Sequence, residues 1–459
     1  MIGGMYQEMS NAVKVQKKQM MLEENIRSVI FKMAVPTIVA QLITTIYNLV
    51  DTFFVSTLGT NATAAVGVNG SLERTISLLG ALIATGASSY ISRLLGVKRD
   101  EDAERVLSTS FYSGVVLAVV FMAIGRLLIN PMVYWLGATP DCAEYSIQYA
   151  TYVLYAAPAL IGSFILNMSM RSEGSATYAM VGIGFGGILN CFLDPLFIYG
   201  LNLGVAGASM ATAIFKYISF FILLYLYARK KSAVAISLQK IKFVAHDVKE
   251  VLAIGSTSFF RTALQVAASV VMNRVAGGFS TAALAALSVA NRVMEFPFAI
   301  ILGFGQGYQP VVGYNWGAKQ AKRVQESLSF SVMTSLVGAV VMGAVLFVTA
   351  GKVVYIFNSE ADAEVLRIGI LCIQLQCIAM PFHAWGSIVN MFYAGVGKAK
   401  NALLLSTARQ GYCFIPVAVI APLLFRETGV AATQAIADVL SLAVTVPLGI
   451  LAFRMAKKL

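Results

Sequence analysis

The segment PALIGSFILNMSMRSEG at residues 158–174 recurs in altered form as PFHAWGSIVNMFYAGVG at residues 381–397. Proline, asparagine, methionine and glycine occur in the same order and at the same spacing in both segments, so that Asn167 corresponds to Asn390. A second pair of segments, GASSYISRLLGVK at 86–98 and GYQPVVGYNWGAK at 307–319, aligns in the same way at two glycines and a lysine. This self-similarity indicates that the chain is built from two structurally equivalent halves.

The composition indicates a membrane protein. Hydrophobic residues make up 58% of the 459 positions and charged residues only 12%, too few polar groups to cover a water-soluble globule. Apolar stretches of about 20 residues have the length of transmembrane helices, whereas the strands of a membrane barrel would be shorter and alternating. The sequence predicts about twelve such helices, at residues 31–56, 64–92, 107–130, 146–170, 178–199, 205–228, 251–275, 283–315, 325–350, 364–395, 402–424 and 430–453.

Equivalent elements of the repeat are six spans apart. Because six is an even number, the two copies should have the same orientation and be related by an axis along the membrane normal. We therefore expect an all-α membrane protein with two parallel-repeat lobes of six helices each. The predicted parts are a cytoplasmic N-terminal tail (1–30), an N-lobe (31–228), a basic amphipathic cytoplasmic linker (229–250) and a C-lobe (251–459).

Lysine and arginine set the predicted orientation. They concentrate in the loops after the even-numbered spans. The intervening loops, taken as residues 57–63, 134–145, 199–204, 276–281, 355–363 and 425–429, contain only Arg426. By the positive-inside rule both termini should be cytoplasmic, in a multi-pass protein of the inner (plasma) membrane. The net charge of +12 then reflects orientation and contact with anionic lipid. We expect a monomer whose partners are the lipid bilayer and small amphipathic molecules, and not nucleic acid.

Asp51 lies inside the first predicted span, in TTIYNLVDTFF at residues 44–54. A charged carboxylate near the bilayer centre costs ~2.5–3.5 kcal/mol on insertion scales, so an intramembrane acid is a functional candidate by default. The alignment that pairs Gly86 with Gly307 also pairs Asp51 with Met272, so the carboxylate does not belong to the duplicated scaffold.

A second polar group occurs in span five, where Asn190 and Asp194 lie four residues apart on one helical face. Two carboxylates that face each other within a bundle repel when both are ionised, so one should hold a proton or a cation should bridge them. The alternative is that local hydroxyl groups, or an arginine such as Arg261, satisfy each acid.

Several segments resemble those of the multidrug and toxic compound extrusion (MATE) family. They are YNLVDTFFVSTLG (47–59), NCFLDP (190–195), GVAGASMATA (204–213) and the proline at the entry of span one, Pro36. The resemblance runs from about residue 25 to the C-terminus. It implies a cofactor-free antiporter in which inward-moving H⁺ or Na⁺ drives the export of amphipathic, often cationic, compounds by alternating access.

The resemblance also implies roles for individual residues. In the prokaryotic branch with a cation site in the N-lobe, the coupling residues match Tyr47, Asp51, Asn190, Asp194 and Thr212. If the coupling ion is Na⁺, the resemblance implies that the last four supply the oxygen atoms of its site. The cavity asparagine of helix four matches Asn167, whereas the span-seven carboxylate of another branch is replaced by Arg261 and Gln265.

Further substrate-binding candidates come from the residues themselves. Asn48 continues the polar stripe of span one, and the C-lobe supplies soft and hydrogen-bonding groups suited to a tolerant pocket. These C-lobe candidates are Arg261, Gln265, Met272, Asn273, His383 and Met391. The methionines are equally compatible with filling gaps in the core, and Arg261 with a structural ion pair.

Pro36 is a candidate hinge, because proline removes one backbone hydrogen bond from the first span. A bend there would reposition the part of the helix that carries Asp51. The alternative is that Pro36 merely opens the helix, as prolines in first turns do.

Two rival classes differ in the chemistry they need. A flippase of lipid-linked sugar precursors, from the same superfamily, would line its cavity with several arginines or lysines for pyrophosphate, and the main candidates are Arg261 and Lys216. An intramembrane enzyme would need a nucleophile–base pair or a metal motif, and the sequence contains neither signature. We therefore expect no enzyme activity.

Overall fold

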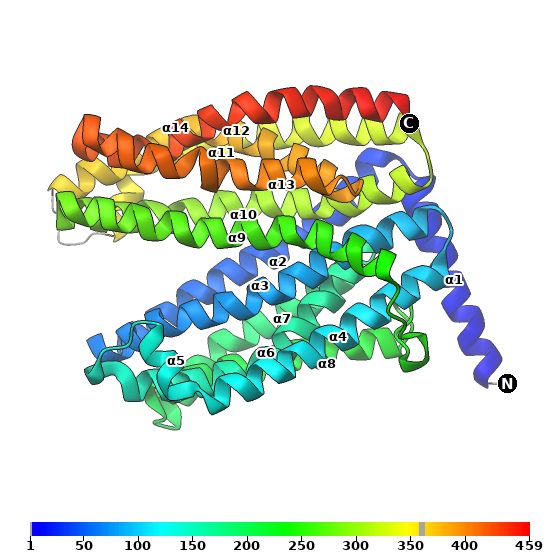
Figure 1. Cartoon of the computed structure of the whole chain (residues 1–459), viewed down its shortest axis with the longest axis horizontal. Helices are drawn as coiled ribbons and strands as arrows, with labels where there is room; N and C mark the ends of the chain where they lie inside the picture. Colours follow the sequence, from blue (N-terminus) through cyan, green and yellow to red (C-terminus); the bar gives the residue numbers. More distant parts are fainter. Residues whose placement is uncertain (1, 358–362) are drawn as a thin grey trace.

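The computed structural model describes residues 2–357 and 363–459, and every regular element in these ranges is a helix (Figure 1). The α-helices are α1 (Ile2–Leu22), α2 (Ile26–Ser56), α3 (Thr60–Gly96), α4 (Asp100–Leu127), α5 (Ile129–Trp135), α6 (Pro140–Ser172), α7 (Ala176–Pro195), α8 (Gly204–Ala228), α9 (Ala245–Phe279), α10 (Thr281–Gly317), α11 (Ala321–Phe357), α12 (Ala363–Gly395), α13 (Ala399–Thr407) and α14 (Phe414–Lys458). Shorter π or 3₁₀ turns are η1 (Leu196–Gly200), η2 (Leu238–Lys240) and η3 (Ala408–Tyr412).

Twelve membrane crossings follow from the described helices. Eleven helical segments are long and apolar enough to span a bilayer, and the last of them, Ala399–Lys458, has 60 residues. A straight helix of that length would measure about 90 Å, roughly three times the thickness of the hydrocarbon core. The chain instead turns back at Arg426, where φ is +51°, so that Gly429 comes against the carbonyl of Ala421. Both termini consequently lie at the same end of the molecule (Figure 1), and the predicted all-α membrane fold is confirmed.

Some boundaries differ from the sequence prediction. The segment expected as a polar tail contains helix α1, and the first span begins earlier, at Ile26, because the side chain of Asn25 accepts a hydrogen bond from the Arg27 amide at 3.0 Å and caps the helix. In the expected amphipathic linker, residues 229–244 form only the single turn η2.

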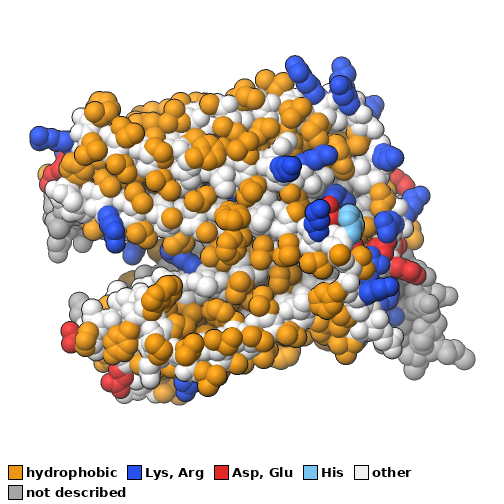
Figure 2. All heavy atoms as spheres, in the orientation of Figure 1, with side chains coloured by type: hydrophobic (Ala, Val, Ile, Leu, Met, Phe, Trp, Pro, Cys, Tyr) orange, Lys and Arg blue, Asp and Glu red, His pale blue; other side chains and the backbone are white. Residues whose placement is uncertain are grey.

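Helices α2–α8 form one half of the molecule and α9–α14 form the other (Figure 1). The halves approach each other at the end that carries both termini and residues 229–244, which we call the linker end. They diverge towards the opposite end, the open end, where the surface is hollowed between them (Figure 2). Apolar side chains cover much of the visible flank, as expected for contact with lipid.

Repeat-related glycines allow the close approach at the linker end. A Cβ atom on Gly86 of α3 would lie 1.9 Å from the carbonyl oxygen of Val251 in α9. A Cβ atom on its repeat equivalent, Gly307 of α10, would lie 2.5 Å from Cα of Ala34 in α2. Because backbone atoms cannot rotate away, these contacts require residues without side chains. The duplicated sequence therefore supplies backbone contacts between the halves.

Helix α1 is tied to both halves at the linker end. The Lys17 ammonium lies 3.5 Å from Oε1 of Glu173, which belongs to the N-terminal half. The carbonyl of Met21 accepts hydrogen bonds from Asn315 (3.2 Å) and Arg323 (3.0 Å), both of the C-terminal half. Met21 itself is completely buried. Helix α1 therefore bridges the two halves and is not a free N-terminal tail.

Pro36 lies in the interior of α2, which begins at Ile26. The alternative in which Pro36 opens the helix is therefore wrong. Its hinge function remains a prediction.

Candidate functional site

The two intramembrane acids of the N-terminal half lie on neighbouring helices. A Cβ atom on Gly187 of α7 would lie 2.9 Å from the ring of Tyr47 in α2, so these helices touch at this level. Asp51 follows Tyr47 by about one turn, and Asp194 lies further along α7 in the same direction. The two carboxylates therefore lie beyond this point of contact, on two helices that pack together.

Several oxygen atoms of this group have no donor. The side-chain amide of Asn190 donates to Oδ1 of Asp194 at 2.8 Å, and both residues are completely buried. In the described part of the chain, nothing hydrogen-bonds to Oδ1 of Asp51, Oδ1 of Asn190 or Oδ2 of Asp194. Buried oxygen atoms left without donors cost free energy, and carboxylate and amide oxygens are the ligands that hard cations prefer. The chemistry of this oxygen set suits a proton or a hard cation such as Na⁺.

Lys216 of α8 lies beside Tyr47 and the α3 acid Glu73. Its ammonium is 3.1 Å from Oε1 of Glu73 in α3 and 5.7 Å from the centre of the Tyr47 ring. Thr212, one turn earlier on α8, is buried, but among the described residues it has no hydrogen bond to Asp51 or to any other member of the group. The structure therefore brings together four of the five predicted coupling residues, and Thr212 makes no hydrogen bond to them in the described part of the chain.

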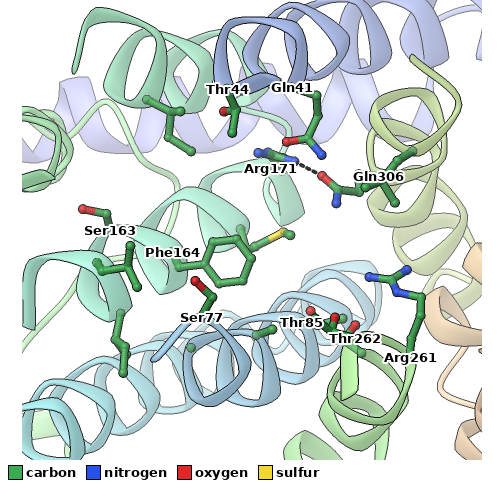
Figure 3. A pocket seen from close by; sticks show the side chains of 18 of the residues that line it. Gln41, Thr44, Ser77, Thr85, Ser163, Phe164, Arg171, Arg261, Thr262 and Gln306 are labelled. Carbon is green, nitrogen blue, oxygen red and sulfur yellow. Dashed lines mark hydrogen bonds between the residues drawn. The ribbon is translucent and has the colours of Figure 1, made fainter. Parts of the chain in front are cut away.

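A cavity of about 340 Å³ lies between the two halves (Figure 3). Side chains from both halves line it, including hydroxyl and amide groups and several apolar groups. Of the predicted site residues, Tyr47, Arg261 and Met391 line this central cavity.

Arg171 is the main functional candidate that sequence reasoning missed. It lies in α6, is 3% exposed, and donates to Oε1 of Gln306 in α10 at 2.6 Å and to Oδ1 of Asn167 at 2.5 Å. The sequence prediction ended span four at residue 170 and so assigned Arg171 to a loop. The repeat contained a signal for Arg171. The alignment of Asn167 with Asn390 also pairs Arg171 with Ala394, so the arginine does not belong to the duplicated scaffold, and both residues line the same cavity.

Asn167, predicted to contact substrate, instead lies behind Arg171. It is completely buried and does not line the central cavity. Its amide donates to the carbonyl of Ala179 at 2.7 Å, and the amide of its repeat equivalent Asn390 donates to the carbonyl of Ala402 at 2.8 Å. The repeated asparagine thus braces two helices in each half, and in the N-terminal half it also orients Arg171.

Arg261 of α9 faces the central cavity from the C-terminal half (Figure 3). In the ranges that the structure describes it has no hydrogen bond or ion pair. The alternative in which Arg261 satisfies an intramembrane acid is therefore wrong for this conformation.

A second cavity, of about 260 Å³, shares Arg261 and Met391 with the first. His383 lines it, with its ring 4.9 Å from that of Phe298. Arg409 also lines it and donates to Oδ1 of the buried Asp438 at 2.6 Å. Neither residue of this ion pair was predicted, although Asp438 is a lone acid in an apolar span, the same signal that identified Asp51.

The other predicted substrate-binding residues are dispersed. Gln265, Met272 and Asn273 line a third cavity, of about 530 Å³, in the C-terminal half. Asn48 is exposed on α2, outside the lining of the central cavity. The structure thus distributes the predicted set over three cavities, a surface position and, for Asn167, a buried position behind Arg171.

The central cavity is basic. Arg171, Lys216 and Arg261 line it, whereas its described lining residues include neither aspartate nor glutamate. The acids that were predicted to couple transport lie behind Tyr47, outside this lining.

The comparisons with known proteins agree with this architecture. The MatE family model matches residues 36–196 and 258–420, one segment in each half. Multidrug export protein MepA of Staphylococcus saprophyticus is 26% identical over 406 residues, 88% of this chain and 89% of that protein. MepA of Staphylococcus haemolyticus is 25% identical over 417 residues, 91% of each chain.

Solved structures have the same fold. A MOP superfamily transporter from Pyrococcus furiosus, described as having a binding pocket of reverse polarity that suggests a different function, superposes with a TM-score of 0.89 at 25% identity and covers 96% of this chain and 99% of its own. The outward-facing conformation of a multidrug resistance MATE family transporter gives a TM-score of 0.91 at 24% identity, over 96% of this chain and 98% of its own. The family match covers well over half of the sequence, with one segment in each half of the structure, and the chain therefore belongs to the MatE family.

Proposed function

We propose that this protein is a secondary antiporter that exports amphipathic organic molecules from the cell in exchange for H⁺ or Na⁺. Membership of the MatE family and similarity to multidrug export proteins support export of small molecules. The observation that carries the coupling proposal is the pair of neighbouring acids, Asp51 and Asp194, with one buried oxygen atom on each that has no donor among the described residues.

Helix α2 connects the acids with the central cavity, because it carries both Asp51 and Tyr47. Tyr47 lines the cavity and lies about one turn from Asp51 on α2. Loading Asp51 or Asp194 with a cation removes the repulsion between them, which changes the packing of α2 against α7 and so the shape of the cavity wall. A cation can drive exchange in this way only if it binds one conformation of the cavity better than the other.

The proposed membrane arrangement follows from the distribution of charge. We place the linker end in the cytoplasm and the open end outside, in an inner membrane, with the protein acting as a monomer. In this arrangement the hollow seen in Figure 2 faces the exterior, where substrate would leave and the coupling cation would enter.

The decisive experiment is gradient-driven export by purified Asp51→Asn and Asp194→Asn proteins in liposomes. Asparagine preserves the size of the side chain but cannot ionise, so we expect a folded protein without driven export. The matched control is Asp141→Asn, which changes an exposed acid in the first turn of α6. Export by Asp51→Asn at the wild-type rate would overturn the coupling role, and imposing H⁺ and Na⁺ gradients separately identifies the ion.

A flippase of lipid-linked sugar precursors remains the second candidate. The observation that favours it is the basic lining of the central cavity, to which the structure adds Arg171 beside the two cations expected from the sequence. Movement of an anionic lipid between leaflets would distinguish it from export of free molecules.

A further inference from the structure

We infer that the central cavity binds the anionic group of an amphipathic substrate between Arg171 and Arg261. This inference rests on the proposed transport function and specifies the charge class of the substrate, in contrast to the cationic compounds implied by the family resemblance.

The inference starts from which cations are neutralised. Lys216 is paired with Glu73 at 3.1 Å, and Arg409 of the adjoining cavity is paired with Asp438 at 2.6 Å. Neither Arg171 nor Arg261 has a carboxylate partner in the described part of the chain. The uncompensated positive charge of the cavity is therefore located at these two guanidinium groups.

Burying the guanidinium group of Arg171 without an anionic ligand costs free energy. It is 3% exposed, and the groups that hold it, Gln306 and Asn167, are both neutral amides. A buried guanidinium without a counter-charge loses hydration that neutral acceptors only partly replace. Its two hydrogen bonds use one donor on each terminal nitrogen and leave the remaining N–H groups of a planar fork, which matches a carboxylate, sulfonate or phosphate.

The two arginines come from opposite halves. Arg171 projects from α6 and Arg261 from α9, and both face the space drawn in Figure 3. An anion between them would be held by both halves at once. Apolar side chains of Leu160, Phe164 and Met391 line the same cavity and suit the hydrophobic part of an amphipathic molecule. The volume of about 340 Å³ lies in the range of small-molecule sites.

The sign of the charge constrains the coupling. A cationic substrate could compete with H⁺ or Na⁺ for the same carboxylates, but an anion held by Arg171 and Arg261 cannot. Exchange then requires that cation loading at Asp51 and Asp194 deform the cavity through α2, so that substrate and cation favour different conformations.

Equilibrium binding tests the inference independently of transport. The probes are two xanthene dyes of similar size, anionic carboxyfluorescein and cationic rhodamine 123, titrated against protein in nanodiscs of uncharged lipid. We expect carboxyfluorescein to bind, and Arg261→Gln to weaken it by about tenfold or more, as expected for loss of a charged hydrogen bond. The matched control is Arg126→Gln, an exposed arginine at the end of α4, which should leave binding unchanged.

Two further variants keep the test falsifiable. Arg171→Gln should weaken carboxyfluorescein similarly if it folds, and Arg261→Glu, at a partly exposed position, should reverse the preference between the dyes. Tighter binding of rhodamine 123 than of carboxyfluorescein by the wild type, or equal anion binding by wild type and Arg261→Gln, would overturn the inference.

Transport by liposomes then separates this inference from the proposed function and identifies the source of the anion. Driven export of carboxyfluorescein supports a free organic anion. Movement only of an NBD-labelled polyprenyl phosphate, detected by dithionite quenching, supports an anionic lipid head group and overturns export of free molecules. Driven export of rhodamine 123 without carboxyfluorescein or the labelled lipid overturns the anionic class while the export function stands.

Discussion

Adding a single methyl group at Gly86 should open the linker end. The Cβ of Gly86→Ala would lie 1.9 Å from the carbonyl oxygen of Val251, far inside the 3.4 Å at which ordinary contact begins. The obstacle is backbone on a helix of the other half, so the two halves must move apart. Overpacking of this kind costs typically ~1–3 kcal/mol. A cost of that size shifts the balance between two conformations by roughly 5- to 150-fold.

The assay is the distance between spin labels at Glu101→Cys and Lys322→Cys, two exposed repeat-related positions at the linker end, in a protein whose five native cysteines have been replaced. We expect Gly86→Ala to increase the population with a long distance. Gly70→Ala is the control, because it makes the same change in the same helix where no atom lies within 4 Å of the added Cβ. Both variants replace glycine by alanine in α3, so any gain in helix propensity is the same in both and cancels in the comparison. Identical distance distributions in Gly86→Ala and Gly70→Ala would refute the reasoning.

Three other predictions address motion, ion binding and the linker end. If Pro36 is a hinge, the spin-label distance between the middles of α2 and α7 should change with pH in the wild type. Pro36→Ala restores a backbone hydrogen bond and should suppress that change. The same pH response in Pro36→Ala and the wild type would contradict the hinge. If Asp51 and Asp194 share one Na⁺, sodium should protect both from carbodiimide, as read by mass spectrometry, and protection of one acid alone would argue against a shared site. Lys17→Gln removes the ammonium beside the buried carboxylate of Glu173, so amide hydrogen exchange in α1 should accelerate. Exchange at the wild-type rate would show that this ion pair does not fix α1 to the N-terminal half.

The sequence predicted the crossings well because each crossing must present about 20 apolar residues to lipid. It also singled out Asp51 and Asp194 as candidates, since a charged group in an apolar stretch is conspicuous, and their coupling role remains a prediction. Arg171 was missed because it lies at the end of an apolar stretch, where a buried arginine and a loop arginine look alike. Burial there depends on packing between helices far apart in the chain, as the bond from Arg171 to Gln306 illustrates.

Helix α1 was missed for a related reason. Its sequence is polar, and a polar segment reads as an exposed tail unless its partners are known. Those partners, Asn315 and Arg323, come from the other half of the chain. Thr212 shows the opposite limit. It matches a family motif, yet among the described residues it makes no hydrogen bond to either acid.

The double attachment of α1 also has a consequence for biosynthesis. Met21 is made before either half, yet its carbonyl accepts hydrogen bonds from Asn315 and Arg323, which follow 294 and 302 residues later. At synthesis rates of about 5–20 residues per second, α1 waits on the order of 15–60 s before its last partners exist. Helix α1 is therefore translated before both halves but is among the last helices to dock, and its attachment marks a chain in which both halves have been inserted.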